Sequence, residues 1–84
     1  MKTIVLSRHA LEQARERGTN EDEIRQAIYE GEESPAKKGR KAFRINLRFG
    51  RRWGGRVYET KQVMPVVVDE KERLVVVTVY VFYF

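Results

Sequence analysis

The sequence predicts an α+β fold in which two N-terminal helices pack on an antiparallel β-sheet, with the elements in the order β-α-α-β-β-β. Two observations predict it. Apolar residues recur every three or four positions between residues 8 and 30, and at every second position from residue 42 onward. With 84 residues, the chain has room for one domain, residues 1–84, in which both helices cover the same face of the sheet.

Each helix is predicted by the residues at its ends. Ser7 can cap the first helix, which should end at Gly18, and Asn20 can cap the second, which should end at Gly31. Glu23 lies three residues after Asn20, which is the spacing of a capping box.

Four segments have the composition or the alternation of strands: residues 2–6, 42–49, 57–68 and 73–84. The residues on the apolar side of the second segment are Phe43, Ile45, Leu47 and Phe49. The Gly-rich segment 50–56 predicts a hairpin tip, and we expect a bend or bulge near Pro65. Residues 30–41 should form a loop, because Pro35 cannot continue a helix.

Positive charge is concentrated in one segment. The chain has 17 Lys and Arg against 12 Asp and Glu, a net charge of +5. Residues 37–61 contain ten of these cations and one acidic residue, a net charge of +9, whereas residues 1–36 have −3 and residues 62–84 have −1. This distribution is typical of a surface that binds a polyanion such as RNA; the alternative is a solvated strand face.

The same segment combines cations with a tryptophan. The candidate RNA-binding residues are Arg44, Arg48, Arg51, Arg52, Trp53 and Arg56. Arginine can bind phosphate with two hydrogen bonds and tryptophan can stack on an unpaired base, so we expect single-stranded RNA as the ligand. The alternative for Trp53 is an anchor that covers the edge of the core.

The composition argues against several classes of site. The chain has no cysteine and one histidine, so we expect no disulfide, no metal site and no cofactor. A charged segment followed by an apolar run does not open the sequence, so we expect no secretory signal, and the apolar run near the C-terminus is too short to cross a bilayer. We therefore expect a cytoplasmic protein with no membrane partner.

The histidine, His9, falls in the first turn of the first helix. It lies near Gln13 on the helical wheel and roughly opposite the apolar side of that helix. Histidine can act as a general acid or base near neutral pH, which suits RNA cleavage. The alternative is an exposed or capping residue without a chemical role.

The last strand is apolar on both sides. Strict alternation puts Thr78 and Tyr80 on the side of Val76, where a hydroxyl group could line a pocket; threonine is also simply a good strand former. Helices are available for one face only, so we expect a partner at Val79–Phe84, either an antitoxin protein or a second copy of the chain.

Three stretches, "SRHALEQARERG", "EIRQAIYEG" and "GRVYETKQVMPVVVDEKERLVVVTVY", resemble a small bacterial family known as domain of unknown function 4258, related to the RelE, ParE and BrnT toxins. The resemblance spans most of the chain and implies two helices on an antiparallel sheet, RNA cleavage without metal, and restraint by an antitoxin. It also implies a catalytic set of His9, Arg17, Lys61, Thr78 and Tyr80.

In that set, His9 would be the general acid or base, Arg17 and Lys61 would stabilise charge on the scissile phosphate, and Thr78 or Tyr80 would position it. By strict alternation Lys61 does not share a side with Thr60, so a bulge or the edge of the sheet would have to bring it into the site. We expect a metal-independent endoribonuclease of toxin–antitoxin type. The alternatives are a non-catalytic RNA-binding module and a toxin that binds a protein target.

Overall fold

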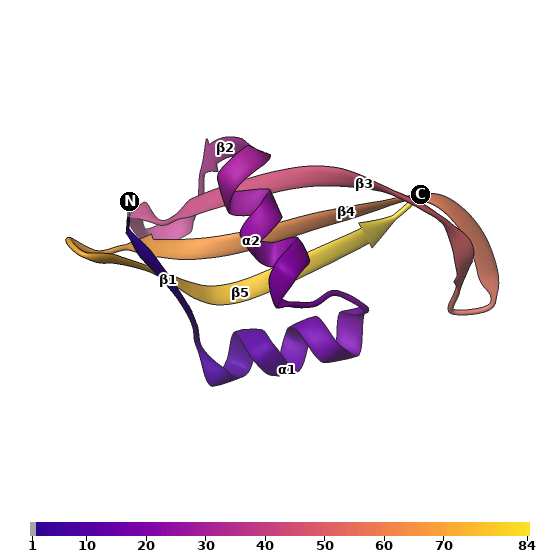
Figure 1. Cartoon of the computed structure of the whole chain (residues 1–84), viewed down its shortest axis with the longest axis horizontal. Helices are drawn as coiled ribbons and strands as arrows, with labels where there is room; N and C mark the ends of the chain where they lie inside the picture. Colours follow the sequence, from indigo (N-terminus) through magenta and orange to yellow (C-terminus); the bar gives the residue numbers. More distant parts are fainter. Residues whose placement is uncertain (1) are drawn as a thin grey trace.

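The computed structural model describes residues 2–84 and has the predicted α+β composition. Two helices follow a first strand and precede the long strands, so the predicted order is confirmed, with one short strand added (Figure 1). In chain order the elements are β1 Thr3–Leu6, α1 Arg8–Arg17, α2 Glu21–Glu30, β2 Glu32–Pro35, the 3-10 turn η1 Lys37–Gly39, β3 Lys41–Trp53, β4 Arg56–Asp69 and β5 Arg73–Tyr83.

The five strands form one mixed sheet in the order β1-β5-β4-β3-β2. The strands β2 to β5 are antiparallel neighbours, but β1 runs parallel to β5 and pairs Thr3–Leu6 with Arg73–Val76. The expectation of a wholly antiparallel sheet is therefore wrong at this edge. Alternation indicates which side chains share a face of a strand and carries no information about strand direction.

The segment 30–41, expected to be a loop, contains a strand and a turn. β2 pairs with residues 41–44 of β3 and forms the outer edge of the sheet. Pro35 fits at the end of this strand because β2 lies at the edge of the sheet. There its missing N–H does not break a hydrogen bond between strands. No helix continues through Pro35, as predicted, but Glu32–Pro35 is paired as a strand.

The predicted caps of both helices are confirmed. Ser7 Oγ accepts a hydrogen bond from the N–H of Ala10 at 3.1 Å, and Gly18 ends α1 with a left-handed φ of 83°. Asn20 Oδ1 accepts from the N–H of Glu23 at 2.9 Å. The carboxylate of Glu23 does not complete a capping box; it binds elsewhere, as described below.

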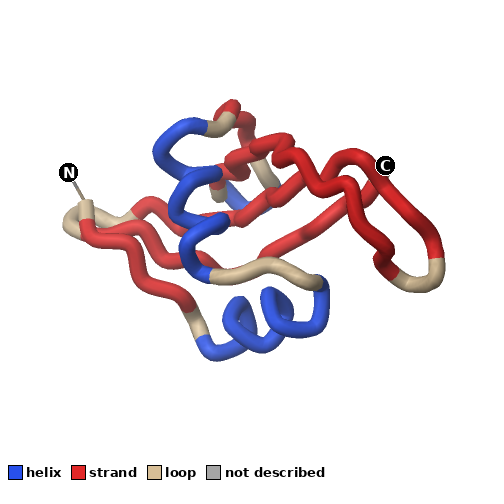
Figure 2. Tube along the Cα trace, turned by 45° about the vertical axis from the view of Figure 1, so that its right-hand side comes forward, coloured by secondary structure: helices blue, strands red, loops and turns tan. Residues whose placement is uncertain are grey.

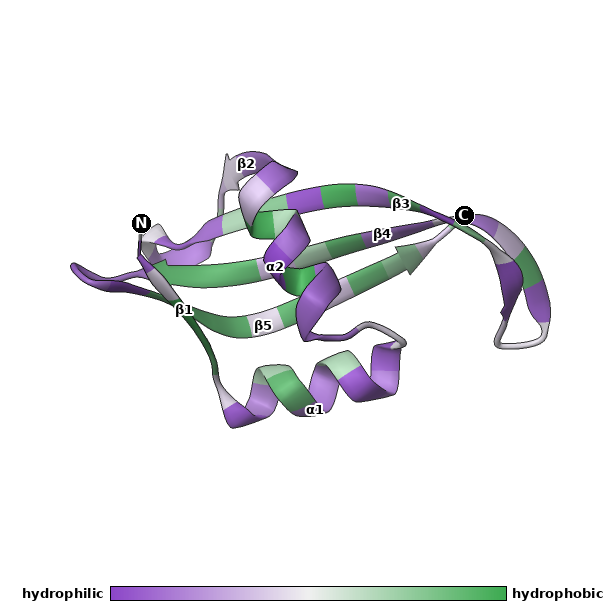
Figure 3. Cartoon of the chain, in the orientation of Figure 1, coloured by the Kyte–Doolittle hydropathy of each residue, from purple (hydrophilic) through white to green (hydrophobic). Residues whose placement is uncertain are grey.

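Both helices contribute to one hydrophobic core on one face of the sheet. α2 crosses β3 and β4, and α1 lies along β5 (Figures 1 and 2). The central parts of β4 and β5 are apolar where the helices cover them (Figure 3). The buried core consists of Ile4, Ala10, Ala14, Ile24, Ile28, Phe43, Val63, Val67, Val76 and Val79.

A β-bulge in β5 changes which residues face the helices. Thr78 lies opposite Val66, but the next residue of β4 lies opposite Val76, so Val77 is the extra residue. Val76 and Val79 consequently both face the core, and both are 0% exposed. Strict alternation along β5, which puts Val76 on the side of Thr78, is therefore wrong at this point. The irregularity in register lies near Pro65, where a bend or bulge was predicted, but the extra residue belongs to β5 and not to the strand that contains Pro65.

A second bulge lies in β3, where Gly50 has a φ of 61°. Beyond it, β3 and β4 continue as a two-stranded hairpin arm, residues 50–59, which extends past the rest of the sheet (Figures 1 and 2). Gly54 and Gly55 have φ values of 58° and 88° and close the arm in a two-residue turn. Two consecutive positive φ angles match the right-handed twist of a hairpin and explain the Gly-Gly pair.

Candidate functional site

The face of the sheet away from the helices, which we call the open face, combines cations with aromatic rings. It consists of Arg44, Asn46 and Arg48 from β3, Thr60, Gln62, Met64 and Val66 from β4, and Thr78, Tyr80 and Phe82 from β5. The rings of Tyr80 and Phe82 are exposed and stack with an interplanar angle of 14°. The open face thus has arginines on one side and a flat aromatic surface on the other.

A pocket of about 450 Å³ lies at one end of the open face. Its floor is formed by Ala42, Met64 and Val66, and Thr78 and Tyr80 line one side. The opposite side is the segment from β2 to β3. The lining residues of that segment are Ser34, Pro35, Ala36, Lys37, Lys38 and Arg40. The structure therefore brings two predicted site residues, Thr78 and Tyr80, into one concave surface with three cations.

Two side chains of α1 bind the edge of β5. Arg17 Nη1 donates to the carbonyl of Val79 at 2.6 Å, and Gln13 Oε1 accepts from the N–H of Val79 at 2.8 Å. Val79 and Pro65 form a non-hydrogen-bonded pair, so the N–H and carbonyl of Val79 point away from β4, toward the edge that β1 leaves uncovered beyond Val76. The guanidinium of Arg17 also lies 5.5 Å from the ring centre of Tyr80. Arg17 is therefore fixed at the edge of β5, beside a ring of the open face.

His9 is exposed in the first turn of α1. It precedes Gln13 by four residues and Arg17 by eight, so all three lie along one side of the helix. The backbone rises by about 12 Å over eight helical residues, but long side chains extend back toward the N-terminus. The guanidinium of Arg17 reaches the same residue of β5 as Gln13 does, and Gln13 lies about one helical turn along α1 from His9.

Lys61 lies on the other face of the sheet, under the helices. It is 4% exposed, donates to the carbonyl of Gly18 at 2.9 Å and pairs with Glu23 Oε1 at 2.7 Å. Thr19 Oγ1 donates to the same carboxylate oxygen at 2.8 Å. The predicted separation of Lys61 from Thr60 is confirmed, and the structure does not bring Lys61 together with Thr78 and Tyr80 on the open face.

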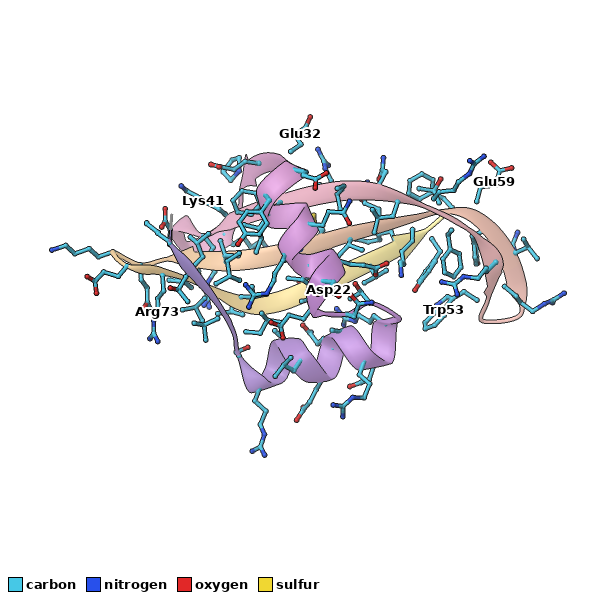
Figure 4. All side chains as sticks on the ribbon, viewed as in Figure 1. Asp22, Glu32, Lys41, Trp53, Glu59 and Arg73 are labelled. Atoms are coloured by element: carbon cyan, nitrogen blue, oxygen red, sulfur yellow. The ribbon has the colours of Figure 1, made fainter. Side chains whose placement is uncertain are left out.

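Trp53 folds back onto the end of α1. Its ring stacks on Tyr83 with centroids 4.9 Å apart and an interplanar angle of 20°. A Cβ atom at Gly18 would lie 2.7 Å from the nearest Trp53 ring atom, so only glycine allows this approach. Trp53 points toward the helices from the hairpin arm (Figure 4). The anchor interpretation of Trp53 therefore describes its contacts, although 37% of the residue stays exposed.

Tyr83 joins α1, the hairpin arm and β5. Its hydroxyl donates to the carbonyl of Arg17 at 2.7 Å, and its ring also contacts Phe49 and Tyr58. Burial raises the pKa of Tyr83 above its usual 10.0, and the nearby carboxylate of Glu23 raises it further. Tyr83 and Lys61 together satisfy the last carbonyl groups of α1, which a helix leaves without internal partners.

The predicted RNA-binding residues divide into two groups. Arg44 and Arg48 lie on the open face, and Arg44 pairs with Glu32 at 2.6 Å. The other members are in the hairpin arm. There Arg51 lies 4.8 Å from the centre of Phe49, Arg56 lies 5.9 Å from that of Tyr58, and Arg52 donates to the carbonyl of Gly55. The arm and the open face are thus two separate cationic surfaces.

Sequence reasoning missed several residues that shape the site. Gln13 and Glu23 look like ordinary polar residues of exposed helix faces, and only the fold gives them Val79 and Lys61 as partners. The cations Lys37, Lys38 and Arg40 were counted in the basic segment without being assigned to a surface. The signal that could have found them is their position in the short connection between β2 and β3, which pair with each other at the edge of the sheet.

Within residues 2–84, no group of three or more His, Cys, Asp or Glu side chains is arranged to share a metal ion. No helix in the same range combines the length and the apolar character that crossing a bilayer requires.

The chain matches the family described as Domain of unknown function (DUF4258) over residues 6–81. No curated protein and no solved structure matches it. The match runs from the end of β1 to a point within β5 and includes α1, the pocket and the hairpin arm.

Proposed function

We propose that this chain, which belongs to the DUF4258 family, is a cytoplasmic, metal-independent endoribonuclease of toxin–antitoxin type. It binds single-stranded RNA on the open face and cleaves it at the edge of β5. The observation that carries the proposal is the position of Arg17, which lies beside Tyr80 at the boundary of the open face and on the same side of α1 as His9. The sequence resembles the RelE, ParE and BrnT toxins, and the ribonuclease members of that group support the same reaction class.

The proposed reaction needs the protein, the RNA and water. The ribose 2′-oxygen attacks the adjacent phosphorus, a bond forms between them, and the bond from phosphorus to the 5′-oxygen breaks. His9 takes the proton of the 2′-hydroxyl or donates the proton that the leaving 5′-oxygen requires, and water serves as the partner for the other proton. Arg17 uses one of its five N–H groups on Val79, and the others can stabilise charge on the phosphate.

Thr78 or Tyr80 would position the phosphate with its hydroxyl group, because both line the pocket and Tyr80 lies beside Arg17. Lys61 has a different role in this proposal. Its ammonium group is occupied by Glu23 and Gly18, so it supports the site indirectly by holding the end of α1, from which Arg17 extends.

A second candidate function is RNA binding without cleavage. The burial of Lys61 favours it, because one of the two cations expected to stabilise the scissile phosphate is paired under the helices. The cations and the stacked rings of the open face would bind RNA equally well in this case.

We also propose a protein partner on the C-terminal part of β5, either an antitoxin or a second copy of the chain. β1 covers β5 only as far as Val76. Beyond that residue, Phe82 and Phe84 are 45% and 57% exposed, which is unusual for such large apolar side chains. A partner at Val79–Phe84 would also cover Tyr80 and so block the proposed cleavage edge.

The test is cleavage of fluorescent single-stranded RNA by the wild-type protein and His9→Ala, in EDTA and in magnesium. We expect cleavage in both buffers, products that end in a 2′,3′-cyclic phosphate, and a loss of about 100-fold or more in His9→Ala. RNA affinity should stay within about twofold of wild type, because His9 is proposed to transfer a proton during cleavage and not to hold the RNA.

The matched control is Glu12→Ala, a change at another exposed position of α1, which should leave cleavage unchanged. If wild-type protein binds RNA but leaves it intact in both buffers, the binding-only candidate replaces the nuclease. If His9→Ala cleaves as fast as wild type, His9 has no catalytic role.

A further inference from the structure

The three cations that line the pocket converge on it without a negative partner. Ion pairs within residues 2–84 do not include Lys37, Lys38 or Arg40, although two carboxylates stand in the adjacent strand β2. Glu32 and Glu33 pair instead with cations of β3. Like charges that share a concave surface favour an anionic ligand.

The backbone of the turn η1 adds an independent observation. Lys38 has a φ of 62° and a ψ of 32°, and Gly39, which follows it, has a φ of 72°. Side chains rarely adopt this left-handed conformation, where glycine or asparagine is usual. Lys38 has this conformation at the rim of a pocket. Its presence is explained by its side chain and not by the backbone preference of lysine.

The interior of the pocket has a different chemistry from its rim. Ala42, Met64 and Val66 form an apolar floor, while Thr78 and Tyr80 present hydroxyl groups at the side. A volume of about 450 Å³ is in the range of pockets that enclose small ligands. A ligand that matches all three features has a flat apolar body, polar edges and a phosphate, which describes an unpaired nucleotide.

We infer that the pocket is a nucleotide subsite for single-stranded RNA. One unpaired base lies against Ala42, Met64 and Val66, the hydroxyl of Thr78 contacts its edge, and the adjoining phosphate binds the cations of the rim. This inference rests on the proposed function and adds to it the position of one nucleotide. Because Tyr80 lines the pocket and also lies beside Arg17, the bound nucleotide is a neighbour of the scissile phosphate.

The test is an NMR titration of ¹⁵N-labelled wild-type protein with the dinucleotide ApA, made resistant to cleavage by a 2′-O-methyl group on its first ribose. The largest shifts should occur at the amide groups of Ala42, Val66 and Thr78. Inorganic phosphate should shift Lys38 and Gly39 and leave the floor unchanged. A double-stranded RNA should leave the floor unchanged as well, because its bases are paired.

Three variants separate the parts of the subsite. Lys38→Gly removes one charge and suits the left-handed backbone, so it should fold and weaken ApA about threefold or more. Ala42→Leu should fill the pocket and weaken ApA at least fivefold, with circular dichroism as the check on folding. Thr78→Val keeps the shape and should alter the order of affinities among dinucleotides with different bases. Lys71→Ala, a cation that does not line the pocket, is the control and should bind as wild type does.

The outcomes distinguish this inference from the proposed function. If RNA is cleaved while the floor resonances stay unchanged, the subsite is wrong and the nuclease stands. If the floor resonances shift while RNA stays intact, the subsite stands and cleavage fails. If inorganic phosphate shifts the floor as strongly as ApA does, the pocket is a simple anion site and the nucleotide assignment is overturned.

Discussion

On the helix-covered face of the sheet, Lys61 is 4% exposed and its ammonium group has a carboxylate and a carbonyl as partners. On the open face, Lys37 and Lys38 are exposed and line a pocket that contains no acidic residue. Both regions contain lysine side chains, but the lysine of the first is buried and those of the second are exposed. A buried cation must have partners because the low-dielectric interior does not solvate it, whereas water allows an exposed cation to stay unpaired until a ligand arrives.

The comparison indicates how to divide a basic protein into stabilising and ligand-binding residues. Position in the basic segment does not separate Lys61 from Lys38, since both belong to residues 37–61. Burial and pairing do separate them. The variants below test this division, in the order of the expected effect.

The largest effect is expected for Lys61→Met, which takes the ammonium donor away from the carbonyl of Gly18 and leaves the carboxylate of Glu23 with the hydroxyl of Thr19 in place of a cation. We expect the free energy of unfolding to fall by about 2–3 kcal/mol. This loss is small for a broken buried ion pair because the side chain of Glu23 is partly exposed. Urea unfolding followed by circular dichroism measures it. Lys71→Met is the exposed control. A loss of no more than about 0.5 kcal/mol, as for an exposed pair, would contradict the comparison.

Gly18→Ala should destabilise the protein more than Gly39→Ala. Both residues have positive φ, which costs about 1–2 kcal/mol for alanine. At Gly18 the added methyl group also meets Tyr83 and Trp53, whereas at Gly39 it meets nothing within 4 Å. We expect an additional loss of about 1 kcal/mol at Gly18, together with a change in the fluorescence of Trp53, the only tryptophan. Equal losses would mean that the hairpin arm does not pack on α1.

Tyr83→Phe should change how stability depends on alkaline pH. The pKa of Tyr83 is raised in the folded state, so its contribution is fully present below pH 10.0 and is lost as the pH rises through the folded pKa. The variant should lose about 1 kcal/mol at neutral pH, from the hydrogen bond to Arg17, and should decline less than wild type above pH 10.0. Thermal unfolding between neutral pH and pH 11 measures it, with Tyr29→Phe, an exposed tyrosine, as control. Parallel declines of Tyr83→Phe and wild type would rule out this linkage.

The smallest effect on stability is expected for Arg44→Ala on the open face. Its pair with Glu32 is exposed, so the change should cost about 0.5 kcal/mol or less. RNA binding should respond instead, with a log–log salt slope that falls by about 0.7 for each lost contact to a single strand. Arg25→Ala, which removes a similar pair from α2, should leave the slope unchanged. An unaltered slope in Arg44→Ala would remove the open face from the RNA-binding surface.

Much of the candidate site could be recognised before the structure, but not its arrangement. Thr78 and Tyr80 stand out in the sequence because a hydroxyl lies among apolar residues, and both line the pocket. The sequence does not predict the other side of the pocket, since residues 30–41 have no periodic pattern and indicate a loop. The partners of Lys61 could not be predicted either, because Glu23 lies 38 residues away in the sequence.

The sequence by itself determined the features that depend on neighbouring residues: the caps at Ser7 and Asn20, the left-handed end at Gly18, the glycine turn of the hairpin, and the alternation along β3. Only the tertiary structure decided the direction of β1, the bulge in β5 that turns Val76 and Val79 to the same side, and the separation of buried from ligand-facing cations. The physical reason is the separation along the sequence of the residues that set each feature. Backbone conformation and side-chain periodicity are set within a few residues, whereas strand direction, register and the partner of a buried charge depend on segments that meet only when the chain is folded.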